Sequence, residues 1–247
     1  MKKIHLIMPM GGGGTRFGNY GFELPKPLIE LRGKPFFYWA AGCITQAIDV
    51  YDITFVVLRD HIDRFSIDKR IKEYYPDARI VVIPEVLNGA VLTCLEGVKE
   101  IKDDLPVLFE DCDHAFVSRK FANFASAGEF EGVDAGLLTF ESHNPAFSFV
   151  RFDEQGNVTG TVEKQAVSDR AICGAYYFGS ADTFRKGTEG YLKNCAYKEF
   201  FVSGVYNELA GAGAKIRVFN LDRHISFGTP AEYEEAKNDT GLGELIR

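Results

Sequence analysis

The chain has few cysteines and no long hydrophobic run. None of its apolar stretches approaches the roughly 18 residues that a transmembrane helix needs, so we expect no membrane span. Its five cysteines are odd in number, widely spaced and without a C-x-x-C pair. This pattern indicates neither a disulfide framework nor a zinc site, and it favours a reducing, cytoplasmic location. The cysteines are Cys43, Cys94, Cys112, Cys173 and Cys195.

Positive charge is also scarce. The 247 residues include 28 Lys and Arg against 35 Asp and Glu, which gives a net charge of −7 and an isoelectric point near 5.3. Because the field of such a protein repels polyanions, we expect neither nucleic acid nor a membrane surface as a partner. A compact phosphorylated ligand is still compatible with this net charge, since a few local cations and backbone amides suffice to bind it. The sequence is also compatible with a homo-oligomer.

Short runs of β-forming residues alternate with helical patterns in the first part of the chain. Such an alternation predicts a largely parallel sheet with helices on both faces. The expected strands are residues 4–8, 53–58, 79–83, 106–109 and 133–140, and the expected helices begin near residues 35, 60, 88 and 117.

The pattern changes from about residue 147. The turn-rich pentapeptide 153–157 separates two alternating runs at 148–152 and 158–164, which predicts an antiparallel hairpin. The sequence shows no linker and no repeat, so one α/β domain with an antiparallel insertion is the simplest interpretation. The later elements expected are strands at 171–178 and 215–219, helices at 181–193 and 204–212, and a last helix that begins at Thr229 and Pro230.

A glycine-rich segment follows the first predicted strand directly. Four consecutive residues without a Cβ permit positive φ angles and let backbone amides approach phosphate oxygens or a base edge. The arginine that follows offers a planar guanidinium suited to phosphate. A plain glycine turn is the alternative. The segment consists of Gly11, Gly12, Gly13, Gly14, Thr15 and Arg16.

Two familiar phosphate-binding loops do not match this spacing. A P-loop requires Lys and then Ser or Thr after its last glycine, whereas Asn19 follows Gly18 here. A dinucleotide-binding loop leads straight into a helix, whereas Pro25 and Pro27 interrupt the segment that follows. The two prolines instead hold Lys26 in an extended segment that fixes the direction of its ammonium. The alternative is an ordinary proline-rich connection with a solvated lysine.

Together, residues 11–17, 25–28 and 33–35 resemble the signature of the nucleotidyltransferases that activate sugar phosphates and related metabolites, the nucleoside-diphosphate-sugar pyrophosphorylases. The resemblance implies a GT-A-like fold, which is a Rossmann-like three-layer α/β sandwich with a mostly parallel mixed sheet and a small antiparallel insertion. It also implies a single domain over residues 1–247, with a nucleotide-binding part to about residue 140 and an acceptor-binding part at about 141–236.

Two carboxylates follow the fourth predicted strand. Asp111 and Asp113 would lie at the carboxyl end of a parallel strand, where such sheets bind ligands, and their oxygens suit Mg²⁺ beside a triphosphate. The resemblance implies that Asp113, three residues before Phe116, is the main metal ligand and that Asp111 is secondary. Two acidic residues that cap a loop are the alternative. We expect the adjacent His114 to pack in that loop, and a supporting role behind the metal ligands is the alternative.

The resemblance also implies contacts to both substrates. Asn88 and Gly89 would meet the base and ribose, although Asn88 is also a good helix N-cap. Glu163 would meet hydroxyls of the acceptor, Lys164 would orient its phosphate, and Gly174 would lie in the strand that follows. An exposed ion pair at a strand end is the alternative for Glu163 and Lys164.

The chain departs from the family near its end. Residues 225–230 resemble the closing Gly-Thr-Pro motif, but the best-known members carry a second metal-binding Asp where this chain has Ser226. Since a hydroxyl is a poor replacement for a carboxylate toward Mg²⁺, metal binding would depend on Asp113, Asp111 and the nucleotide phosphates. Asp222, four residues earlier, is a candidate replacement.

The implied activity is nucleotidyl transfer, in which an acceptor phosphate attacks the α-phosphorus of an NTP and pyrophosphate leaves. Arg16 and the glycine amides would hold the β and γ phosphates, and Lys26 would bridge the α-phosphate and the incoming phosphate. Short relatives serve surface-polysaccharide synthesis, often with CTP. Two other functions stay open: a glycosyltransferase of the same fold that uses Asp111 and Asp113, and a non-catalytic nucleotide-binding homologue, which Ser226 suggests.

Overall fold

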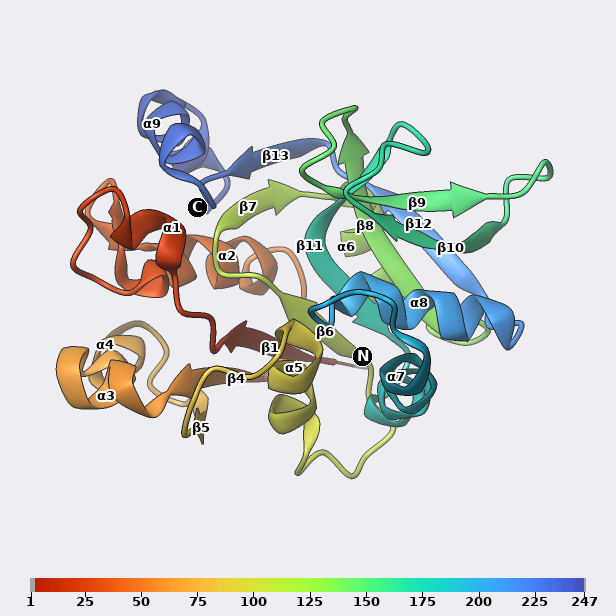
Figure 1. Cartoon of the computed structure of the whole chain (residues 1–247), viewed down its shortest axis with the longest axis horizontal. Helices are drawn as coiled ribbons and strands as arrows, with labels where there is room; N and C mark the ends of the chain where they lie inside the picture. The colour runs from red at the N-terminus through yellow and green to blue at the C-terminus, as the bar shows by residue number, and fades with distance from the viewer. Residues whose placement is uncertain (1–2, 247) are drawn as a thin grey trace.

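The central strand β1 (Ile4–Met10) is almost completely buried, because its run of apolar residues packs on both faces. The computed structural model describes residues 3–246, so residues 1, 2 and 247 of the predicted domain lie outside it. Strand β1 pairs in parallel with β4 (Val50–Leu58) and β6 (Val107–Glu110), and β4 pairs in parallel with β5 (Arg79–Ile83). This parallel half confirms the alternation predicted from the sequence (Figure 1).

The other half of the sheet is mainly antiparallel. Strand β11 (Arg170–Phe178) pairs antiparallel with β6, β8 and β9, which joins the two halves. The predicted hairpin is present as β9 (Ser148–Phe152) and β10 (Val158–Glu163). Strand β12 (Ile216–Asn220) returns in parallel beside β8 (Ala135–Glu141). The resulting nine-stranded mixed sheet has the order β10-β9-β11-β6-β1-β4-β5, with β8 and β12 beside β11.

Two small sheets were not predicted from the sequence. Strand β7 (His114–Val117) pairs antiparallel with β13 (Arg223–Ser226), and β2 (Glu30–Leu31) pairs with β3 (Lys34–Pro35). The first of them brings the segment after the acidic pair against the end of the chain, as Figure 1 shows.

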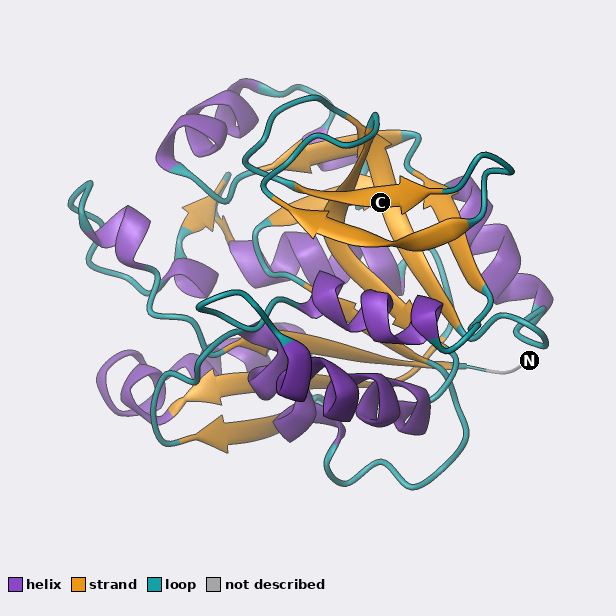
Figure 2. Ribbon diagram, turned by 45° about the vertical axis from the view of Figure 1, so that its right-hand side comes forward, coloured by secondary structure: helices purple, strands orange, loops and turns teal. Residues whose placement is uncertain are grey.

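Helices cover both faces of the large sheet, as the alternation predicted (Figure 2). On one face Leu6 and Met8 of β1 share a core with α2, α4 and α6, whereas on the other face Ile7 packs with α5, α7 and α8. Because successive side chains of a strand point to opposite faces of the sheet, the core consists of two layers, one on each face. The helices on the first face are α2 (Phe36–Thr45), α3 (Arg59–Phe65), α4 (Ile67–Tyr74), α6 (Arg119–Ala127) and α9 (Pro230–Asn238); those on the second are α5 (Ala90–Val98), α7 (Ala181–Asn194) and α8 (Val202–Gly211).

Capping explains several helix boundaries. The side chains of Ser118, Ser180 and Thr229 accept hydrogen bonds from backbone amides of α6, α7 and α9. Thr229 and Pro230 thus begin the last helix as predicted. Short helical turns also occur at α1 (Thr15–Gly18), η1 (Lys26–Leu28) and η2 (Leu242–Glu244).

Two findings bear on the composition. All five cysteines are free. Within residues 3–246, no helix is long and apolar enough to cross a membrane.

Candidate active site

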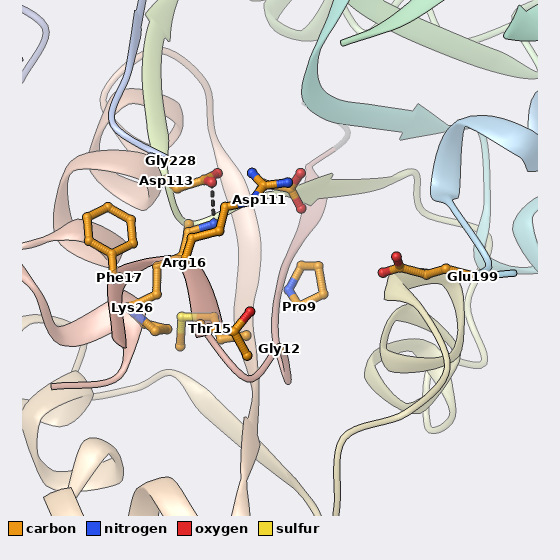
Figure 3. Close-up of a pocket in the computed structure, with 14 residues that line it drawn as sticks. Pro9, Gly12, Thr15, Arg16, Phe17, Lys26, Asp111, Asp113, Glu199 and Gly228 are labelled. Carbon is orange, nitrogen blue, oxygen red and sulfur yellow. Dashed lines mark ion pairs between the residues drawn. The ribbon is translucent and has the colours of Figure 1, made fainter. Parts of the chain in front are cut away.

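A cavity of about 430 Å³ lies where β1 and β6 end at the same edge of the sheet. Because these neighbouring strands run in parallel, the glycine-rich segment after β1 and the acidic pair after β6 meet there (Figure 3). Most of the predicted phosphate-binding and metal-binding residues line this cavity. They are Gly12, Gly14, Thr15, Arg16, Lys26, Asp111 and Asp113.

The glycines of the loop have different structural roles. Gly14 has φ +62°, and a Cβ there would lie 3.4 Å from the backbone nitrogen of Lys26. Gly11 is packed instead: a Cβ there would lie 2.5 Å from Cδ1 of Ile83. Gly12 faces open space, since a Cβ there would meet no atom of the described chain within 4 Å, and it lines the cavity with Gly14. Gly11 and Gly13 are not among the lining residues.

The ammonium of Lys26 forms an ion pair with the carboxylate of Asp113, which joins the two motifs (Figure 3). Pro25 is extended, with φ −61° and ψ 145°, but Lys26 itself begins the 3₁₀ turn η1, so the extended conformation predicted for Lys26 is wrong. Burial alone would lower the pKa of Lys26, but attraction to Asp113 outweighs it and raises that pKa. Burial alone would likewise raise the pKa of Asp113, and attraction to Lys26 lowers it instead. Both groups are therefore charged at neutral pH.

Asp111 has a different protonation behaviour. Burial, followed by repulsion from the Asp113 carboxylate, raises the pKa of Asp111 to about 7. Two carboxylates that lie close together oppose each other's ionisation, and a cation between them would relieve the repulsion. The pair is thus better suited to a bound cation than to a site without one.

The residues present fit a divalent cation. Asp111, Asp113 and His114 offer ligand-type atoms that all lie within 4.8 Å of one another. A Cβ at Gly174 would lie 2.8 Å from both Oδ2 of Asp111 and Nε2 of His114, so the absence of a side chain there leaves both atoms unobstructed. Carboxylate oxygens and an imidazole nitrogen are ordinary ligands of divalent ions in proteins.

His114 does not pack in a loop, so that expectation is wrong. It lies in strand β7, and its side chain is 3% exposed. Burial lowers the pKa of His114 to about 4. The fully buried Glu110 has Oε1 3.6 Å from Nε2 of His114, and burial raises the pKa of that carboxyl well above its usual range. A neutral carboxyl and a neutral imidazole therefore lie behind the acidic pair.

The predicted acceptor residues lie farther from this cavity. The buried carboxylate of Glu163 accepts hydrogen bonds from the hydroxyls of Ser148, at 2.5 Å, and Ser203. Lys164 is exposed, with its ammonium 5.6 Å from the ring centre of Phe201. Of the three predicted acceptor residues, Gly174 lines a second cavity, whereas Glu163 and Lys164 line neither this cavity nor the first. That second cavity, of about 240 Å³, shares Arg16, Asp111 and Asp113 with the first and also includes Phe201 and Ser226.

Asn88 and Gly89 do not line either cavity. Gly89 has φ +106°, and a Cβ there would lie 2.5 Å from the backbone nitrogen of Phe200. The Phe200 amide donates to the carbonyl of Asn88 at 3.3 Å, and the Val91 amide donates to the carbonyl of Phe200 at 3.3 Å. The alternative N-cap role of Asn88 is wrong, because Gly89 occupies the N-cap of α5 and no side chain caps it. The glycine here serves close packing of two backbone segments.

Among the residues that sequence reasoning missed are Glu199 and Gly228, which line the first cavity, and one replacement that it proposed is wrong. Glu199, in the segment between α7 and α8, reaches toward the cavity from the side opposite Lys26 (Figure 3). Gly228 lies directly against the Asp113 carboxylate, and the Gly-Thr-Pro motif was the signal that could have identified it. Asp222 lies outside both cavities, where its carboxylate accepts from the guanidinium of Arg119 at 2.7 Å, so it does not replace the missing metal ligand.

Comparisons with known proteins agree with this arrangement. No protein-family model matches the chain. A 2-C-methyl-D-erythritol 4-phosphate cytidylyltransferase of Clostridium perfringens is 32% identical over 120 residues, which are 49% of this chain and 51% of that protein. The same enzyme from two further strains matches over the same length. The chain thus spans about half the length of the curated relatives it matches.

Two solved structures resemble the whole chain. The nucleoside-diphosphate-sugar pyrophosphorylase from Vibrio cholerae RC9 superposes with a TM-score of 0.80 at 20% identity, over 95% of this chain and 100% of that one. The inositol-1-phosphate CTP transferase from T. maritima superposes with a TM-score of 0.75 at 13% identity, over 100% of this chain and 96% of that one. These relatives are nucleotidyltransferases, which confirms the resemblance seen in the sequence: the chain has the nucleotidyltransferase fold.

Proposed function

We propose that the chain is a nucleotidyltransferase that couples an NTP to a phosphorylated small molecule and releases pyrophosphate. The observation that carries the proposal is the ion pair between Lys26 and Asp113, which joins the lysine after the glycine-rich loop to the acidic pair inside one cavity. A triphosphate needs cations and amide donors together with carboxylates that can hold a metal ion, and this cavity brings such groups together.

The NTP would lie in the larger cavity. There the backbone of Gly12 and Gly14 and the guanidinium of Arg16 would bind the β and γ phosphates. Lys26 would leave Asp113 for the α-phosphate, because a phosphate oxygen competes for the same ammonium. A divalent cation held by Asp111 and Asp113, Mg²⁺ in the simplest case, would neutralise charge on the phosphates.

The phosphorylated acceptor would lie in the second cavity. Both cavities include Arg16, Asp111 and Asp113, so ligands bound in the two would meet at these residues. A phosphate dianion needs no general base, and catalysis would then depend on positioning and charge neutralisation. Gly174 opens this cavity, and Lys164 would reach the acceptor phosphate from the neighbouring hairpin.

Pyrophosphate release with each of ATP, CTP, GTP, UTP and dTTP, against a panel of sugar 1-phosphates and other phosphorylated metabolites, tests the proposal. The names of the cytidylyltransferase and of the CTP transferase support CTP as the first nucleotide to try. Release that requires one NTP and one acceptor is expected. Transfer from a ready-made nucleotide sugar without pyrophosphate would indicate a glycosyltransferase instead. NTP binding without turnover would indicate a non-catalytic homologue. A cytoplasmic role in surface-polysaccharide synthesis belongs to the same proposal.

A further inference from the structure

We propose that Nε2 of His114 is a direct ligand of the divalent cation beside Asp111 and Asp113, so that the site favours Mn²⁺ or Co²⁺ over Mg²⁺. The inference deepens the proposed function and rests on it, since it assigns one more ligand, and an ion class, to the same cation site. Its test uses the metal alone and needs no nucleotide.

The first observation is that the imidazole of His114 is buried without a partner. Its side chain is 3% exposed, and within residues 3–246 neither ring nitrogen meets the geometry of a hydrogen bond, although the backbone of Gly174 lies close enough to favour the protonated ring. A buried polar group without a partner costs free energy, so such a group in a native site calls for a ligand that satisfies it. Oε1 of Glu110 lies 3.6 Å from Nε2, which is too long for a hydrogen bond.

The second observation is the direction of Nε2. A Cβ at Gly174 would lie 2.8 Å from Nε2 of His114 and 2.8 Å from Oδ2 of Asp111. The two atoms therefore face the same small volume, which stays free because residue 174 has no side chain. Its φ of +99° also favours glycine. With Asp113, the three ligand-type atoms lie within 4.8 Å of one another.

The third observation concerns the strand opposite. In the pairing of β13 with β7, Ser226 is the register partner of His114. Residues directly opposite in an antiparallel pair project from the same face. The imidazole of His114 and the hydroxyl of Ser226 thus lie on the same face of this two-stranded sheet. The chain offers a nitrogen ligand on this pair of strands in place of a second carboxylate.

The chemistry of the ligands selects the ion. Mg²⁺ binds oxygen ligands in near-ideal octahedral geometry, whereas imidazole nitrogen suits the later first-row ions. Two carboxylates and one imidazole would hold Mn²⁺, and Co²⁺ more tightly still, in the general order of divalent affinities. Mg²⁺ would gain little from the nitrogen.

The experiment is pulsed electron paramagnetic resonance on the full chain loaded with Mn²⁺ and no nucleotide. We expect hyperfine coupling from one directly bound nitrogen in the native chain, and its loss in His114→Gln. Calorimetric titration should show Mn²⁺ affinity at least about tenfold weaker in that variant, with a smaller change for Mg²⁺. His61→Gln removes another buried imidazole, one outside both cavities, and should change neither result.

Absence of nitrogen coupling in the native chain would overturn the inference, even if the variant did not fold. Coupling that persists in folded His114→Gln would overturn it too, because the coupled nitrogen would then belong to another group; if His114 only pairs with Glu110, the native chain should show no coupling. Native protein that shows the coupling yet releases no pyrophosphate would contradict the proposed function alone. Native protein that releases pyrophosphate with Mg²⁺ and shows no nitrogen coupling would contradict this inference alone.

Discussion

Replacement of Lys26 by methionine separates the chemical role of its ammonium from its structural role. The side chain is 26% exposed and pairs with Asp113, which is 21% exposed, so water screens the pair only partly. Methionine keeps most of the volume but removes the charge. If the ammonium binds the α-phosphate in the transition state, its loss should cost about 3 to 4 kcal/mol, or roughly a hundred- to thousand-fold in kcat.

The same substitution should also affect stability in a metal-dependent way. Without Lys26 the carboxylates of Asp111 and Asp113 repel each other with no cation between them, and the pKa of Asp113 should rise. We therefore expect a lower Tm in metal-free buffer and partial recovery when Mg²⁺ or Mn²⁺ is added. Thermal unfolding with and without metal measures this effect.

Initial rates of pyrophosphate release at saturating substrates measure the effect on kcat. Lys69→Met, which removes the charge of an exposed lysine in α4, is the matched control and should behave as the native chain does. If Lys26→Met kept a kcat close to that of the native chain, the assignment of Lys26 to the transferred phosphate would be wrong. A low kcat together with a low Tm that no metal restores would point to misfolding instead.

Four further substitutions test other parts of the site. Burial and a neighbouring carboxylate raise the pKa of Asp111 from 3.8 to about 7. Between those pH values the folded chain keeps a proton on Asp111 that the unfolded chain loses. The free energy of unfolding therefore falls as pH rises through this range. In metal-free buffer Asp111→Asn should therefore gain Tm relative to the native chain as pH rises from 4 to 7, and parallel Tm curves would refute the assignment. Gly89→Ala should lower the free energy of unfolding by about 1 to 3 kcal/mol in denaturant titrations, because its methyl meets the backbone of Phe200 at a positive φ. Gly12→Ala faces open space and should leave that free energy unchanged while weakening NTP binding. Asp222→Asn should leave Mn²⁺ affinity unchanged in calorimetry, since this residue lies outside both cavities.

Local patterns were sufficient to predict the large sheet. Strands β1 and β5 are nearly continuous apolar runs between clear breaks, and the hairpin carries a turn-rich pentapeptide at its tip. By contrast, β7 and β13 are four residues each and follow turns without an alternating pattern. Their pairing depends on contacts between distant parts of the chain, which no local pattern encodes. The strand character and the burial of His114 were missed for that reason.

The sequence predicted the position of those site residues that belong to short motifs directly after a strand. Lys26 and Asp113 belong to short motifs after neighbouring strands, and the sheet brings them together. The cavity position of Glu199 depends instead on how the segment before α8 packs. That segment is held by the backbone hydrogen bond between Phe200 and Asn88, which the sequence does not reveal. The same packing against Phe200 explains the glycine at position 89, and the sequence alone could not predict this role.

The loop that carries Asp111 and Asp113 is fixed by both halves of the sheet. Strand β6 belongs to the parallel half, and its antiparallel partner β11 belongs to the other half, with Ala175 opposite Glu110. One step farther along, the Asp111 amide donates to the carbonyl of Gly174 at 3.0 Å. The residue that opens the second cavity is thus hydrogen-bonded to a residue shared by both cavities. Any shift of β11 on acceptor binding would move Asp111, so the acceptor and the cation should influence each other's affinity through this single backbone contact.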